Sequence, residues 1–274
     1  MQELRSRKLT AVLNVGPAVA PPWATVPEGT SLNGLGPNYP DSTHFLNYGA
    51  FVKAFVNHMK NDLKISDSVW QIGNEPNVYK ENWNSTASPK LYTLYLKSAY
   101  TQIKKVFPGS TVLTAGMGGN RGNDQVAGNL TGPQFIKGVY DAGGKGYFDA
   151  ISYHPYEHAY DLTRPNGWTE MLEVRNTMVA YGDKDKKIWA TEVGEPAAAL
   201  GSGNVGEQAQ ADLLTDAYTR FRQYSWAGPM FYYQLRNRPV PDSVNTPIAS
   251  TYGLLRIDNS KKPAFDAFVN VNRF

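Results

Sequence analysis

Two glutamates, each at the end of an apolar segment, are the residues of this sequence most suited to chemistry. Residues 69–72 lead into Asn74-Glu75-Pro76, and residues 187–190 lead into Thr191-Glu192-Val193-Gly194. Proline cannot continue a sheet ladder, so the first motif predicts that Glu75 is the last extended residue of its strand. Two carboxyl groups at two strand ends could provide the acid/base and the nucleophile for a reaction on a sugar.

Polar and aromatic residues follow the other apolar segments too. His154 and Tyr156 come directly after residues 148–153. A tyrosine hydroxyl at this place is expected to donate to Glu192 and keep that carboxylate ionised and oriented, as a nucleophile requires. Asn74 is expected to bind a sugar hydroxyl. Glu75 needs a raised pKa to act as an acid, which burial and the charge of Glu192 would supply.

Apolar strands and helical patterns alternate along the whole sequence. Strands are predicted at 9–15, 69–72, 111–115, 148–153, 187–191 and 229–235, and helices at 45–61, 89–106, 131–142, 169–180, 207–224 and 263–271. Continuous apolar strands that alternate with helices predict a parallel sheet covered by helices, as in a (β/α) barrel, within a single domain over residues 1–274. A closed barrel needs eight strands, so six units leave it incomplete.

The strand order brings the two glutamates together. Glu75 ends the second predicted strand and Glu192 ends the fifth. Strands three units apart face each other across the mouth of a barrel, at the end where active sites of this fold lie. The two carboxyl groups are therefore expected to converge, with His154 and Tyr156 between them.

Composition excludes several other classes of function. The net charge is only +3 with no Lys/Arg cluster, which argues against nucleic acid or a membrane surface as a partner. Cysteine is absent, so a disulfide, a thiolate metal site or a cysteine nucleophile is excluded. The first residues lack the apolar core of a signal peptide. Neither the oligomeric state nor the compartment follows from the composition.

Two further motifs have alternative interpretations. Residues 154–158 match the His-x-x-Glu-His zinc pattern, but Pro155 follows a strand, where the pattern needs a helix. Residues 116–121 approach a dinucleotide fingerprint, but Arg121 replaces the third glycine, and a flexible loop is the better interpretation. Trp23, Trp83 and Trp168 are equally compatible with stacking on sugar rings and with packing at the edge of the core.

The motifs around the two glutamates carry a resemblance to a known group. Asn74-Glu75-Pro76, His154-Pro155-Tyr156 and Thr191-Glu192-Val193-Gly194 together resemble the retaining glycoside hydrolases built on a (β/α)8 barrel, especially family 39 and the cellulase-like family 5. The resemblance spans nearly the whole chain from Leu9 onward. It implies that Glu75 is the acid/base at the fourth barrel strand and Glu192 the nucleophile at the seventh. It also implies a carbohydrate substrate, no metal, no cofactor and a secreted protein.

The resemblance also places the remaining residues. Trp23, in Pro22-Trp23-Ala24, matches a loop after the third strand in which an aromatic side chain shapes the sugar subsites. The last strand of the group carries a tryptophan under the substrate; here residues 231–234 read Phe-Tyr-Tyr-Gln, and Tyr233 is expected to take its place. Strands one and two have no counterpart, nor has the arginine of the second strand that supports the nucleophile. A further segment or chain is therefore expected to complete the barrel.

The sequence thus favours a glycosidase that cleaves β-linked glycosides or polysaccharides by double displacement. Two alternatives stay open. One is a non-catalytic carbohydrate-binding protein derived from such an enzyme, and the other is a structural domain that uses the fold for binding. The sugar, the linkage and endo or exo action do not follow from the sequence.

Overall fold

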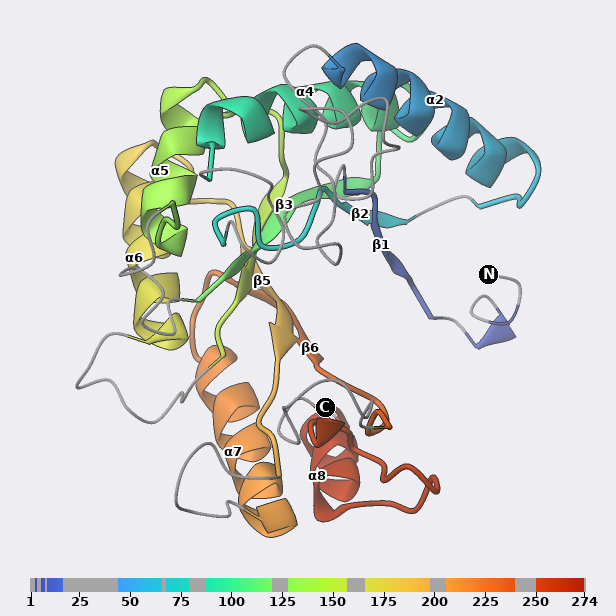
Figure 1. Cartoon of the computed structure of the whole chain (residues 1–274), viewed down its shortest axis with the longest axis vertical. Coiled ribbons are helices and arrows are strands. Elements are labelled where there is room, and N and C mark those ends of the chain that lie inside the picture. Colours follow the sequence, from blue (N-terminus) through green and yellow to red (C-terminus); the bar gives the residue numbers. More distant parts are fainter. Residues whose placement is uncertain are drawn as a thin grey trace.

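The structure is a computed structural model that describes residues 9–16, 44–65, 68–78, 87–119, 128–156, 166–197, 206–239 and 250–273, together with positions 3, 6 and 7. It is an α/β fold in which six parallel strands form a curled, open sheet of the (β/α)-barrel type. Figure 1 shows the helices in an arc, from α2 at the top through α5 and α6 at the left to α7 and α8 at the bottom, with the strands inside it.

Strands and helices alternate strictly among the described elements. The strands are β1 (Val12–Asn14), β2 (Val69–Gln71), β3 (Thr111–Gly118), β4 (Ala150–His154), β5 (Ile188–Val193) and β6 (Ala227–Tyr232). The helices are α2 (Phe45–Asn61), α4 (Pro89–Val106), α5 (Gly132–Asp141), α6 (Gly167–Ala180), α7 (Gly206–Phe221) and α8 (Pro263–Val271). All six predicted strands and all six predicted helices are confirmed, with shifts at their ends.

The order of the strands in the sheet is their order in the sequence, and every neighbouring pair is parallel. Each strand-to-strand connection crosses over through a helix, which is what parallel pairing requires. Because all strands point the same way, their carboxyl ends meet at one edge of the sheet. The residues that follow β2, β4, β5 and β6 are therefore brought to a common mouth.

Neither edge of the sheet has a further strand beside it in the described part of the chain. Among the described residues, β1 pairs only with β2 and β6 only with β5. The side chains of β2 and β4 are buried throughout, whereas β1 and β6 are mostly half-buried. Large apolar side chains are exposed near both edges, with Leu9, Leu46 and Phe51 on the β1 side and Leu235 and Ile257 on the β6 side. The expectation that a further segment or chain completes the barrel stays a prediction.

Sequence signals at the helix ends account for several boundaries. The Ser88 side chain accepts a hydrogen bond from the Leu91 N–H, and Pro89 occupies the first turn of α4. Thr131 and Gln134 form a reciprocal capping box at the start of α5. Asn166 caps α6 by accepting from the N–H groups of the first turn. No helix in the described part of the chain is both long and apolar enough to cross a membrane.

The main hydrophobic core lies between the outer face of the sheet and the helices. Side chains that point outward from the strands fill it, such as Trp70 of β2 and Tyr153 of β4, both fully buried. Trp70 packs edge-on against Phe55 of α2 and contacts Phe107 after α4. The helices of the described part of the chain thereby cover the outer face of the sheet.

The inner face of the sheet is layered along the strands. Its floor is a small apolar cluster of Val69, Leu113 and Ala150, with Val12 and Trp189 packed against it. Because side chains on one face recur every second residue, the next layer toward the mouth is made by Asn14, Gln71, Ser152 and Thr191. That layer is polar, so the inside of the curled sheet changes from apolar to polar toward the mouth.

Tyr92 of α4 ties its helix to two strands. Its hydroxyl donates to the Ile72 carbonyl at 3.0 Å and accepts from the Ala115 N–H at 2.6 Å, and the side chain is fully buried. Burial raises the pKa of Tyr92 well above its ordinary value, so the group stays a neutral hydroxyl. A residue that bonds to two neighbouring strands fixes the helix relative to the sheet.

Tyr92→Phe is expected to lower the free energy of unfolding by about 2–6 kcal/mol, because a buried C=O and a buried N–H each lose their partner at roughly 1–3 kcal/mol. Urea denaturation measures the change. The matched control is Tyr100→Phe on the same helix, whose hydroxyl is partly exposed and 3.5 Å from Asp149 Oδ1. An equal loss in both variants would contradict the role given to Tyr92.

Candidate functional site

Glu75 lies in a turn that β3 holds in place. Strand β2 ends at Gln71, and Glu75 has a φ of +42°, in the left-handed region that non-glycine residues rarely adopt. The expectation that Glu75 is the last extended residue is therefore wrong. Its N–H donates to the Gly116 carbonyl of β3 at 2.8 Å, which anchors the turn. Left-handed backbone at a non-glycine residue costs roughly 1–2 kcal/mol, and such conformations cluster at functional sites.

Asn77 fastens the rest of this turn to the end of β3. Its amide nitrogen donates to the carbonyls of Gly118 and Leu130, and its side-chain oxygen accepts from the Gly118 N–H at 3.0 Å. The side chain is almost fully buried. Asn77 is thus a structural residue that sequence reasoning missed, although it directly follows the Asn74-Glu75-Pro76 motif.

His154 lies between the two glutamates, as the strand order predicts. Its Nδ1 is 2.9 Å from Glu75 Oε1 and 3.9 Å from Glu192 Oε2. The His154 side chain is completely buried, whereas the Glu75 and Glu192 side chains are 17% and 32% exposed. The prediction that the two carboxyl groups converge is confirmed, and one imidazole is the point at which they meet.

Gly116 provides the room for this imidazole. A Cβ atom at position 116 would lie 2.0 Å from His154 Nε2, far inside any van der Waals contact. A side chain at Gly118 would also crowd the Glu75 carboxyl group, with a Cβ 3.2 Å from its Cδ. Both glycines belong to β3, so the flexible loop expected at 116–121 is wrong over residues 116–118, which are strand. Residues 120 and 121 lie outside the described residues. The glycines are needed for close approach rather than for flexibility.

Tyr156 follows β4 and orients Glu192. Its hydroxyl donates to Glu192 Oε2 at 2.8 Å, which confirms the predicted contact. Burial and the neighbouring Glu192 carboxylate raise the pKa of Tyr156 far above its ordinary value. The hydroxyl therefore keeps its proton and remains a donor to Glu192. Such a bond fixes the orientation of the Glu192 carboxyl group.

Two more tyrosines join Tyr156 at the mouth. The Tyr233 ring lies 6.3 Å and the Tyr252 ring 6.0 Å from that of Tyr156, both edge-on, and Arg238 lies over the Tyr233 ring. Tyr233 follows β6, at the expected place. Tyr252 belongs to the segment before α8, and sequence reasoning missed it because no motif surrounds it. The three rings form an aromatic wall beside Glu192.

A cavity of about 290 Å³ opens on the inner face of the sheet beside these residues. Its walls are Val12, Asn14, Gln71, Asn74, Thr191, Glu192 and Phe231. Asn74 and Glu192 thus face one space, at the end of an inner face that is apolar at its floor. The volume is close to the lower end of ligand pockets, which span roughly 300–1,000 Å³.

Several residues considered from the sequence as candidates to bind sugar or metal do not lie at this mouth or are not described. Trp23, Trp83, Glu157 and His158 lie outside the described residues. Trp168 is wrong as a stacking candidate, because it lies in α6, fully buried against Phe221. The described part of the chain holds no group of three His, Cys, Asp or Glu residues placed to bind a metal.

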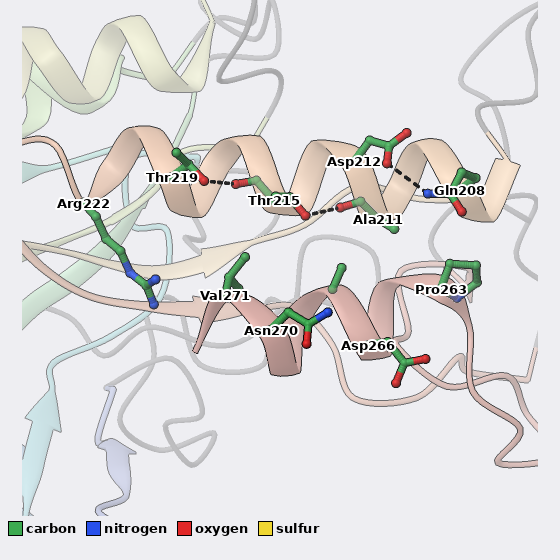
Figure 2. Close-up of a pocket in the computed structure, with 11 residues that line it drawn as sticks. Gln208, Ala211, Asp212, Thr215, Thr219, Arg222, Pro263, Asp266, Asn270 and Val271 are labelled. Carbon is green, nitrogen blue, oxygen red and sulfur yellow. Dashed lines mark hydrogen bonds between the residues drawn. The ribbon is translucent and has the colours of Figure 1, made fainter. Parts of the chain in front are cut away.

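A larger cavity of about 610 Å³ lies on the outside, between α7 and α8 (Figure 2). The Thr215 and Thr219 hydroxyls donate to carbonyls of their own helix, and Gln208 donates to Asp212. Its polar groups are thus largely paired within α7, and it contains none of the residues that meet at the mouth.

Several solved glycoside hydrolases have a similar fold. A family 39 glycoside hydrolase from the gut symbiont Bacteroides cellulosilyticus aligns with 88% of this chain at 25% identity and a TM-score of 0.59. A monomeric β-xylosidase from Caulobacter crescentus aligns with the whole chain at 16% identity and a TM-score of 0.66. A glucosidase from Croceicoccus marinus aligns with 98% at 16% identity and a TM-score of 0.67.

The chain spans about half the length of these structures, with 47%, 55% and 51% of them covered. No protein-family model matches it, and no curated protein matches it by sequence. At these identities the likeness establishes the fold, which is the barrel architecture of glycoside hydrolases. The observations that bear on the reaction are the residues at the mouth of the sheet.

Gly116→Ala is expected to displace the His154 ring and to lower the free energy of unfolding by about 1–3 kcal/mol, the usual cost of overpacking. The matched control is Gly109→Ala, because a Cβ atom at position 109 would meet no atom within 4 Å. Denaturation curves and the imidazole NMR signals of His154 measure the two effects. Unchanged signals in Gly116→Ala would show that the glycine is not needed for the imidazole.

Proposed function

We propose that this protein is a glycosidase that hydrolyses β-linked glycosides by double displacement, with Glu192 as nucleophile and Glu75 as acid/base. The observation that carries the proposal is the convergence of both carboxyl groups on His154 at the carboxyl-terminal mouth of a parallel sheet. The fold shared with glycoside hydrolases supports the same class of reaction.

The spacing of the carboxyl groups supports the retaining route. Glu75 Oε1 and Glu192 Oε2 both lie near His154 Nδ1, so their separation cannot exceed the sum of the two distances, about 6.8 Å. Retaining enzymes hold their carboxyl groups roughly 5–5.5 Å apart, and inverting enzymes roughly 6.5–9.5 Å apart to admit a water. Most of the inverting range is therefore excluded for these two oxygens.

The surroundings of the two carboxyl groups support their roles. Glu192 accepts a hydrogen bond from Tyr156 and is the more exposed of the two, so its carboxyl group is held in place and is accessible to an anomeric carbon. Glu75 is less exposed and contacts an imidazole nitrogen, a partner that can exchange a proton with it. In the first step Glu75 protonates the leaving oxygen, and in the second it takes a proton from the attacking water.

The substrate-binding roles are proposals of the same kind. Asn74 and Glu192 line one cavity, so a sugar hydroxyl bound by Asn74 would belong to the reacting ring. Tyr233 stands beside Tyr156 where an aromatic face can carry the sugar. Trp23 is proposed as a further subsite residue from its sequence position alone.

Glu192→Gln and Glu75→Gln are each expected to abolish hydrolysis of a β-glycoside with a poor leaving group, with losses of at least about 10²–10⁴-fold. With an aryl β-glycoside that has a good leaving group, the Glu75 variant should keep the rate of the first step. That step then needs little acid assistance. The control is Glu173→Gln on the exposed face of α6. Full activity in both site variants would refute the assignment.

Azide is expected to rescue small-side-chain variants with opposite stereochemistry. In Glu192→Gly, azide takes the place of the nucleophile and gives the α-glycosyl azide. In Glu75→Ala, azide attacks the glycosyl enzyme from the other face and gives the β-glycosyl azide. NMR of the products distinguishes the two. The same product from both variants would contradict the division of roles.

A carbohydrate-binding protein without activity is the second candidate, and the open edges of the sheet at β1 and β6 favour it. Such a protein would bind oligosaccharides, and Glu192→Gln would leave the affinity within a few-fold. A panel of aryl β-glycosides and polysaccharides, assayed for both hydrolysis and binding, separates the two candidates. Turnover lost in the glutamate variants supports the enzyme, and binding without turnover supports the alternative.

A further inference from the structure

We propose that Gln71, Ser152 and Thr191 form a hydroxyl relay that holds a proton on Nε2 of His154, so that His154 Nδ1 and Glu75 hold one further proton between them. The inference rests on the proposed function, in which Glu75 is the acid. The relay residues act on Glu75 only through His154, so they are positioning residues. They come from β2, β4 and β5 and form the polar layer beneath the two carboxyl groups.

The relay starts at the Gly73 carbonyl, an oxygen that can only accept. The Gln71 amide nitrogen donates to it at 3.0 Å. A flipped amide would place two acceptor oxygens against each other, so the orientation of Gln71 is fixed. Its Oε1 therefore faces Ser152, 3.1 Å away. Gly73 has a φ of +100°, a conformation that glycine adopts readily, and this conformation directs the carbonyl.

The remaining hydrogen-bond directions follow from counting protons. Gln71 Oε1 can only accept, so the single hydroxyl proton of Ser152 goes to it. Thr191 must then donate its own proton to Ser152, with which it forms a close hydrogen bond. Its oxygen is left to accept from His154 Nε2, 3.1 Å away. One arrangement satisfies these four contacts together, and it puts a proton on Nε2.

A proton on Nε2 decides what Nδ1 can do. In a neutral imidazole the other nitrogen carries a lone pair, and here it faces Glu75 Oε1 at 2.9 Å. That contact is attractive only with a proton between the two atoms, on either a neutral Glu75 or an imidazolium. When Glu75 passes this proton to the departing sugar oxygen, a carboxylate and a neutral imidazole remain. The water of the second step returns the proton to the pair.

The groups around the pair favour keeping that proton. Glu192 faces Nδ1 from β5, and its negative charge opposes a second negative charge on Glu75. Tyr156 and Tyr233 also lie near the pair, and burial is the main cause that raises the pKa of each. Tyr153 points to the other face of the sheet, where it donates to Glu170, and burial raises its pKa too. They stay neutral hydroxyls. Arg238 lies beyond Tyr233, over its ring.

The first test reads the protonation of His154 directly, without any assay of activity. Histidine-labelled protein gives nitrogen NMR signals for four histidines, and His154→Gln identifies the signal of His154. We expect a protonated Nε2 across neutral pH in the native protein. A native His154 with a bare Nε2 and its proton on Nδ1 would overturn the proposal, whatever the enzyme does.

The second test compares Thr191→Val with Thr191→Ser. Valine keeps the shape but removes the acceptor, so the neutral imidazole can move its proton to Nδ1 and donate to an ionised Glu75. The pair then gives up its extra proton more easily. The basic limb of the pH profile of kcat/KM should move to lower pH by about one unit, the equivalent of one hydrogen bond. Serine keeps the hydroxyl and should keep the position of the limb, whatever the absolute rate.

The outcomes separate the inference from the proposed function. A uniform loss of rate with an unmoved limb in Thr191→Val, or an equal shift in both variants, would overturn the relay. If Thr191→Val fails to fold, the relay is tested by the nitrogen NMR signal of His154 in the native protein alone. A bare Nε2 in that signal would overturn it. If Glu75→Gln keeps full activity, the proposed function fails, while the protonation of Nε2 is still measured on its own terms.

Discussion

The site depends on one steric constraint: the imidazole of His154 fills the space that a side chain at Gly116 would need. Strand β3, which carries Gly116, lies between the strand that leads to Glu75 and the strand that carries His154. The same residue accepts the backbone hydrogen bond that anchors Glu75. One glycine therefore both admits the imidazole and places the carboxyl group against it. Without that close approach, the two partners on β2 and β4 would be held apart by the strand between them.

The layers inside the curled sheet explain why a polar site is compatible with a stable fold. The apolar floor of Val69, Leu113 and Ala150 excludes water from the base of the inner face. The polar side chains above it bond to one another, so their burial leaves few groups without partners. Charge is confined to the mouth, where the glutamate side chains are partly exposed. The main core lies on the other face of the sheet and does not depend on these groups.

The elements could be predicted from the sequence because their signals are local. Helical spacing predicts the bounds of α2, α4 and α8 to the residue, with a capping serine at the start of α4. The contact between Tyr156 and Glu192 follows from their places near the ends of β4 and β5. The left-handed backbone of Glu75 could not be predicted, because it results from a bond to another strand. The close approach of Gly116 to His154 could not be predicted either, because it depends on the register of β3 against β4. The sequence does indicate one part of the proposed relay. Ser152 and His154 lie two residues apart in a strand, so their side chains share one face of the sheet.

The proposed roles of the two glutamates rest on a difference between their surroundings. Glu192 is bonded to a tyrosine whose proton is firmly held, so its partner can stabilise a charge but cannot supply a proton. Glu75 is bonded to an imidazole nitrogen, which can either take or give one. A nucleophile needs the first kind of partner and an acid/base needs the second. The roles proposed for these two identical side chains thus differ because β4 presents a different partner to each. That partner is His154, at the end of the strand, for Glu75, and Tyr156, two positions later, for Glu192.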